Sequence, residues 1–251
     1  MLGLPITIQE IIAQHSAELS RLRQALDLAS PKEAKIPTSE RAIFPLGVAC
    51  RDLLEEVIFS ASAGFGRLAL RTVRTMHECV VFARYLDQHP EKTADYLAAF
   101  HSQWAMFLRN IPDAEKSLPE VHQEVTGRVP EYGAGKRIEL EWRDKTTLKM
   151  AEDVNIPSQF HAFAFNDTST YIHPGAGFIL RHISQVRPDG VIEINSQPQD
   201  REAIRALRLS HPLILNILNL RLKYAPSNAL SGLLEECKKD FVKIWGYQPP
   251  I

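Results

Sequence analysis

The sequence predicts a mainly α-helical protein, an antiparallel helical bundle with one small β-hairpin inserted near the C-terminal third. Apolar residues recur at three- and four-residue spacing along most of the chain, whereas strand-like alternation is rare. The connections between the periodic segments are short, which favours antiparallel neighbours in a bundle. We expect a single domain over residues 1–251, with a core at 44–182 and a C-terminal hairpin and helical pair at 178–246.

Local start and stop signals divide the first half of the chain. An amphipathic helix over 6–29 should end at Ser30-Pro31, because the residue before proline disfavours the helical conformation. A second helix over 44–63 has Leu54 and Val57 on its core face. The sequence Gly-Phe-Gly at 64–66 interrupts the helical pattern, and a third helix continues from there to Asp87. Pro90 suits the first turn of a fourth helix, which we expect over 91–109.

The second half alternates short helices with loops. A helix over 113–125 is followed by a loop at 126–137, rich in Gly, Pro and charge, which is typical of a functional or mobile segment. Helices over 145–153 and 158–172 are interrupted at Pro157. The hairpin pairs 178–186 with 191–194 around Pro188-Asp189-Gly190, and helices over 199–223 and 228–245 close the chain.

The composition excludes several classes of protein. The chain is 45% hydrophobic and 24% charged with a net charge of -1, so a protein that coats nucleic acid or an anionic membrane is not expected. The three cysteines lie far apart among apolar neighbours, which indicates reduced core residues and no disulfide framework. No signal peptide or membrane-spanning run is apparent, so we expect a cytoplasmic, non-membrane protein that uses no cofactor.

A charged stripe on an otherwise apolar helix is the first candidate site. Arg67, Arg71, Arg74 and Glu78 recur at steps of four, three and four, so they share one face of the helix. Arg74 and Glu78 are close enough to pair, leaving Arg71 and Arg67 to add positive potential over an anionic ligand such as a phosphodiester. The alternative is a structural ion-pair network, with further acidic partners supplied by Glu55 or Glu56.

The second candidate site is a polar helix end. Asn166, Ser169 and Thr170 lie on the same face as His173, the side chain best suited to act as a general acid or base near neutral pH. The alternative is a histidine that caps its helix, with hydroxyls bonded to the preceding turn.

Other signals are weaker. The segment 133–136, Gly-Ala-Gly-Lys, lacks the spacing of a phosphate loop. A metal site built from His161, Asp167, His173 and His182 is not expected, because none has helix-facing ligand spacing. Arg201, Arg205 and Arg208 form a basic helix face, which indicates a solvated surface or a contact to a partner or RNA. Motifs of serine hydrolases and dinucleotide-binding enzymes are missing from the sequence.

Two blocks resemble a widespread family of helical bacterial proteins whose function is uncharacterised. One is 64–86, with its Arg-Thr-Met-His-Glu core at Arg74 to Glu78; the other runs from Trp142 to Ser169-Thr-Tyr-Ile-His173-Pro174. The match covers roughly 44–182. More distantly, the arrangement is similar to the HEPN helical bundle, many members of which are metal-independent RNases of defence and toxin systems.

The HEPN resemblance implies a ribonuclease that acts on RNA, a homodimer, and a partner protein from a defence or regulatory operon. HEPN enzymes have an arginine and a histidine with four to six residues between them, but Asn166 and Asp167 stand where that arginine would precede His173. The implied catalytic residues are therefore His173, Arg74 and Glu78, with substrate contacts from Arg67, Arg71, Asn166, Ser169 and Tyr171. A non-catalytic module that binds a small anion, a nucleotide or a partner protein is the competing interpretation.

Overall fold

The computed structural model describes residues 7–30, 40–97, 111, 113–120, 122–123, 145–173, 183–194 and 199–250, and it confirms a mainly α-helical fold with one small antiparallel hairpin. The long elements are α1 (Ile8–Gln14), α2 (Ser16–Ala29), α3 (Ile43–Ser62), α4 (Gly66–Gln88), α11 (Asp200–Tyr224) and α12 (Asn228–Trp245). The short elements are η2 (Pro90–Lys92), α6 (Ala114–Ser117), α8 (Thr147–Asp153), α9 (Ser158–His161), the π-helix η4 (Ala162–Asp167), β1 (Ile183–Val186) and β2 (Ile192–Ile194).

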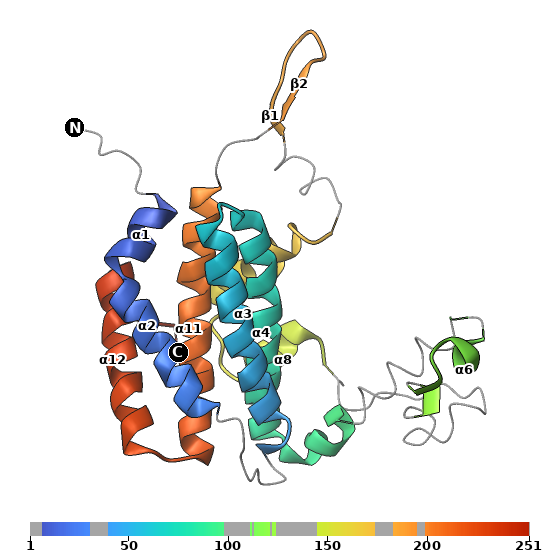
Figure 1. Ribbon diagram of the computed structural model, residues 1–251, viewed down its shortest axis with the longest axis vertical. Coiled ribbons are helices and arrows are strands. Elements are labelled where there is room, and N and C mark those ends of the chain that lie inside the picture. Colours follow the sequence, from blue (N-terminus) through green and yellow to red (C-terminus); the bar gives the residue numbers. More distant parts are fainter. Residues whose placement is uncertain are drawn as a thin grey trace.

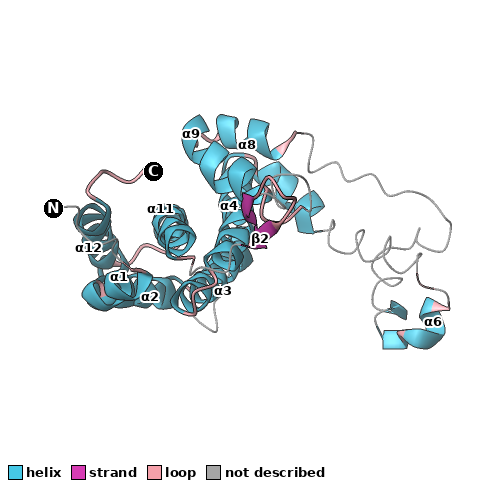
Figure 2. Cartoon of the chain, turned by 90° about the horizontal axis from the view of Figure 1, so that it is seen from above, coloured by secondary structure: helices cyan, strands magenta, loops and turns pink. Residues whose placement is uncertain are grey.

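The central element of the bundle is α11. Seen from above, α12, α1, α2, α3 and α4 form an arc around it, with α8 and α9 beyond α4 (Figure 2). Fifteen residues of α11 are buried, including an unbroken run from Leu209 to Leu218, because the helix is covered on several sides. The late segment that the sequence presents as the next-to-last helix is therefore the core of the fold.

Helices α4 and α11 run in parallel, with their first turns together (Figure 1). A Cβ atom at Gly66 would lie 2.3 Å from the backbone oxygen of Gln199 and 2.5 Å from the backbone nitrogen of Ala203, so only glycine permits this approach. The Gln199 side chain accepts a hydrogen bond of 2.8 Å from the backbone N–H of Arg67. At the far ends, Asp87 accepts hydrogen bonds from Lys223 and Tyr224.

Ion pairs join the outer helices to one another and the N-terminal half of the chain to the central helix. Arg221 of α11 pairs with Glu40, and both side chains are 4% exposed. Arg21 of α2 donates two hydrogen bonds of 2.8 Å to Asp240 of α12. The Arg221 side chain also donates to the backbone carbonyl of Ala29, which ties the end of α2 to the centre of the bundle.

The structure differs from the predicted elements in three helices. The described part of the predicted helix over 113–125 contains the short α6, which is followed by a bend at Leu118. The first predicted helix is split at His15, whose backbone conformation (φ -115, ψ 24) separates α1 from α2. The predicted helix over 158–172 is instead α9 followed by η4 and a turn, because a π-helix inserts one extra residue per turn that a 3.6-residue pattern does not show.

Several predictions fall partly outside the described residues. The fourth helix is described to residue 97, and the loop at 126–137 lies outside the described ranges. The hairpin pairs Ile183 with Ile194 and Val186 with Ile192, with a turn at the predicted Pro188-Asp189-Gly190. Within the described parts of the chain, no helix combines the length and apolar character needed to cross a bilayer.

Candidate functional site

The segment 162–173 lies between the arginines of α4 and those of α11. On the α4 side, Arg74 donates a hydrogen bond of 3.0 Å from Nε to Ser169 Oγ and another of 2.8 Å to Glu78. The same guanidinium group lies 4.4 Å from the ring centroid of Phe165. The structure therefore brings the charged stripe of α4 and the polar helix end together.

The α11 side is built in the same way. Arg205 forms an ion pair of 2.5 Å with Asp167, and its guanidinium carbon lies 5.5 Å from the ring centroid of Phe163. Each of the two arginines thus has one polar and one aromatic contact from the same segment. We call this arrangement the arginine clamp: Arg74 and Arg205 with the intervening residues 162–173.

The hydroxyl groups after η4 hold the backbone in shape. Thr168, Ser169 and Thr170 donate hydrogen bonds to the backbone carbonyl groups of Ala164, Phe165 and Asp167, at 2.6 to 2.7 Å. Such bonds compete with regular helical bonding and suit a helix end. Ser169 donates to Phe165 while it accepts from Arg74, so it positions the guanidinium group.

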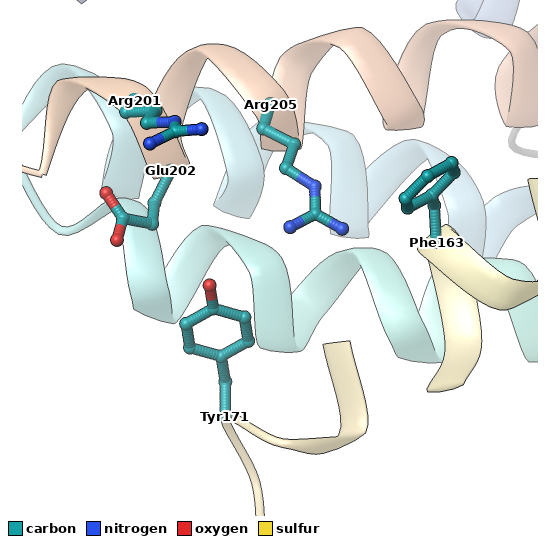
Figure 3. Close-up of a pocket in the computed structure, with 5 residues that line it drawn as sticks. All are labelled: Phe163, Tyr171, Arg201, Glu202 and Arg205. Carbon is teal, nitrogen blue, oxygen red and sulfur yellow. The ribbon is translucent and has the colours of Figure 1, made fainter. Parts of the chain in front are cut away.

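A pocket of about 400 Å³ opens between the clamp and the first turns of α11. Its lining residues are Phe163, Tyr171, Arg201, Glu202 and Arg205. The Tyr171 hydroxyl points from below toward α11, from which Glu202 and Arg205 extend downward, while the Arg201 side chain lies along the helix (Figure 3). Tyr171 is only 2% exposed, because its side chain belongs to the hydrophobic core as well as to the pocket lining.

A second pocket of about 470 Å³ adjoins the first, and the two share Phe163 and Arg205. It is lined mainly by apolar and aromatic side chains, among them Phe160, Leu209 and Tyr247. Arg208 closes one side, where its Nε donates a 3.2 Å hydrogen bond to the Tyr247 hydroxyl and its guanidinium carbon lies 4.7 Å from that ring. The two pockets form one groove along α11.

Beneath the clamp, two histidines are buried against each other. The rings of His77 and His161 lie 5.0 Å apart between centroids, and both side chains are at most 1% exposed. Burial lowers the pKa of His77 to about 3, with smaller contributions from His161 and Arg74, and burial also lowers the pKa of His161. Both imidazoles are therefore neutral at pH 7 and form part of the clamp's support.

The other predicted site residues are distributed around this arrangement. His173 and Asn166 are exposed, and the backbone N–H of His173 bonds to the Ser169 carbonyl at 3.2 Å. Among the described residues, no hydrogen bond or ion pair joins the His173 side chain to Arg74 or Glu78.

Of the other two arginines of the α4 stripe, Arg67 is less accessible than Arg74. Arg67 is buried, with 6% of its surface exposed, and Arg71 is half-buried. Glu55 does not belong to the stripe. It accepts two hydrogen bonds from Arg23 of α2, because α3 directs it toward that helix.

Sequence reasoning left out Phe163, Phe165 and Glu202 as site residues and treated Arg201, Arg205 and Arg208 as a separate surface. Their spacing of four and three residues did indicate one helix face, but only packing brings that face to Asp167. Within the described ranges, no three His, Cys, Asp or Glu side chains gather closely enough to hold a metal ion. His182 and the segment 133–136 lie outside those ranges.

Comparison with known proteins identifies the family to which the chain belongs. No curated protein and no solved structure matches it. A family model described as a family of unknown function, DUF5677, matches residues 40–191, which is more than half of the chain. The match includes the α4 stripe and the whole segment 162–173, whereas α11 and its arginines follow it. The chain therefore belongs to the DUF5677 family.

Proposed function

We propose that this protein binds a small phosphate-bearing ligand in the groove beside the arginine clamp. The observation that carries the proposal is the pair of guanidinium groups, Arg201 and Arg205, along one wall of a pocket of about 400 Å³. Guanidinium groups suit phosphate because their planar N–H donors match its oxygens in pairs. The pocket volume lies within the range of small-molecule sites, which is about 300 to 1,000 Å³.

The charge balance of the face supports an anionic ligand. Three arginines of α11 line the groove: Arg201, Arg205 and Arg208. The carboxylates beside them are Glu202, which lines the same pocket, and Asp167, which pairs with Arg205. This local excess of positive charge occurs in a chain whose net charge is -1, so it is a property of the face and not of the whole protein.

Preorganisation is the second support. Arg205 is held by Asp167 and Phe163, and these contacts fix the guanidinium group before any ligand arrives. Ordering a long side chain on binding otherwise costs about 0.5 to 1.5 kcal/mol. A ligand that meets an already ordered arginine avoids most of that cost.

Titration calorimetry with inorganic pyrophosphate tests the proposal. We expect saturable binding that weakens with added salt, because screening reduces the attraction between exposed charges. Arg201→Gln should reduce the affinity at least fivefold with an unchanged unfolding temperature, since Arg201 is exposed. Arg51→Gln is the matched control, because Arg51 lies on α3 and pairs with Asp52. Equal binding by wild type and Arg201→Gln, or no binding at all, would contradict the proposal.

A second candidate function is the metal-independent ribonuclease implied by the HEPN resemblance. The contact between Arg74 and Ser169 supports it, because it places a guanidinium group one helical turn from His173. His173 would be the base or acid, Arg74 and Arg71 would stabilise the transition state, and Glu78 would orient Arg74. Arg71 and His77 also have five residues between them, but the His77 ring is buried, so His173 is the imidazole that a substrate can reach.

Incubation with single-stranded RNA in the presence of EDTA tests the ribonuclease. A positioned histidine contributes about 10² to 10⁴-fold to such a reaction, so His173→Ala should lose cleavage to that extent while its unfolding temperature is unchanged. Sedimentation of the same samples would show whether a dimer, as in many HEPN enzymes, accompanies activity. Unchanged cleavage by His173→Ala would refute the assignment, and the anion-binding proposal would stand independently.

A further inference from the structure

We propose that the ligand of this groove is a nucleoside monophosphate, with its base stacked on Phe163 and its phosphate beside Arg201 and Arg205. This inference rests on the proposed anion-binding function and adds the identity of the rest of the ligand. The argument comes from the unlike chemistry of the two adjoining pockets, which share Phe163 and Arg205. One pocket suits a flat apolar group and the other suits an anion with hydroxyl groups.

The apolar half provides a surface for a base. Phe163 is 56% exposed, although phenylalanine gains most free energy when buried, and Tyr247 is 37% exposed. A guanidinium group from α11 lies over each ring: the guanidinium carbon of Arg205 is 5.5 Å from the Phe163 centroid, and that of Arg208 is 4.7 Å from the Tyr247 centroid. Alternating aromatic and guanidinium groups stack well on nucleobases, which have an extended π face. Gln159 supplies an amide at the edge of this pocket for hydrogen bonds to a base.

The polar half explains why a carboxylate lies among the arginines. Glu202 lines the same pocket as Arg201 and Arg205, and it would repel a bare phosphate ion. A carboxylate accepts hydrogen bonds from sugar hydroxyls, as acidic residues do for ribose in dinucleotide sites. A ligand with both hydroxyl donors and a phosphate therefore satisfies this pocket better than an inorganic anion. Asp167 is already paired with Arg205, so it adds little further repulsion.

The dimensions of the groove favour one nucleotide. Arg201 and Arg205 are one helical turn apart, a rise of about 6 Å, so one phosphate can lie between them. Phe163 comes from the opposite wall and faces the same space (Figure 3). The second pocket, of about 470 Å³, shares that ring and Arg205 with the first. Sugar and base can extend from the phosphate into it without leaving the groove.

Calorimetry with AMP, UMP, ribose 5-phosphate and adenosine tests the inference on the full chain. We expect the better of AMP and UMP to bind about tenfold more tightly than ribose 5-phosphate, a gap within what base–aromatic stacking supplies. Phe163→Ala should remove that gap. Because the Phe163 ring also contacts Arg205, we expect ribose 5-phosphate binding itself to weaken by about two- to fivefold, the value of one such cation–π contact. Arg201→Gln should weaken both ligands. Phe59→Ala is the matched control, because Phe59 is 74% exposed on α3 and lies outside both pockets.

The possible failures are distinguishable. Equal affinities for ribose 5-phosphate and both nucleotides would overturn the inference while the anion-binding proposal stands. Adenosine binding as tightly as AMP would contradict both proposals, because the phosphate would then contribute nothing. A single-stranded oligonucleotide that binds more than tenfold more tightly than either nucleotide would also overturn the inference, since the groove would then be part of a longer track.

Discussion

The buried His77 should make the stability of this protein depend on pH. Its ring faces His161, Phe160 and Phe165, with Arg74 nearby, and burial lowers its pKa from 6.5 to about 3. Between pH 6.5 and about pH 3, His77 binds a proton in the unfolded chain but not in the folded chain. Above pH 6.5, protonation of His77 therefore takes nothing from the free energy of unfolding. As the pH falls from 6.5 toward 3, the free energy of unfolding decreases progressively.

The size of the effect follows from the two pKa values. Each pH unit below 6.5 lowers the free energy of unfolding by about 1.4 kcal/mol for one such histidine. Between pH 7.5 and pH 5.0, His77 alone should therefore account for a loss of about 2 kcal/mol. His161 and His211 also have pKa values lowered by burial, but they are present in any His77 variant and contribute to both proteins.

Urea denaturation of wild type and His77→Leu at pH 7.5 and 5.0 measures this contribution. At pH 7.5 the two proteins should differ by no more than about 1 kcal/mol, because the variant replaces a neutral buried ring with an apolar side chain of similar size. At pH 5.0 the variant should retain about 2 kcal/mol more of its stability than wild type. His173→Ala, which removes an exposed histidine, should behave like wild type. Equal losses for wild type and His77→Leu would refute the reasoning.

Two further predictions concern packing at the centre of the bundle. Gly66→Ala should destabilise the protein by about 1 to 3 kcal/mol in urea, because its Cβ would meet the backbone of Ala203; Gly232→Ala in α12, where nothing lies within 4 Å, should be neutral or stabilising. Glu40→Gln should cost about 3 to 5 kcal/mol, because it leaves the buried Arg221 guanidinium without its carboxylate, and a loss below 1 kcal/mol would contradict this account of the pair.

The contacts of Arg74 and Arg205 show which parts of the site the sequence predicts and which it does not. Helical spacing alone predicts that Arg74 pairs with Glu78, and the structure contains that pair at 2.8 Å. No spacing rule connects Arg74 with Ser169, 95 residues away, or Asp167 with Arg205. These contacts depend on the packing of α4 beside α11, which Gly66 permits. The π-helix η4 was missed for a related reason, since its extra residue is stabilised by hydrogen bonds and packing that periodicity does not encode.

The sequence by itself determined the helical class, the limits of α3, α4, α11 and α12 to within a residue or two, and the turn of the hairpin. These features depend on local spacing, capping residues and prolines, which act over a few residues. Only the tertiary structure decided that α11 is the central helix, that its arginines and those of α4 flank one segment, and that His77 is buried while His173 is exposed. Those outcomes depend on which faces meet, and burial of apolar surface selects the faces without a signal in local sequence.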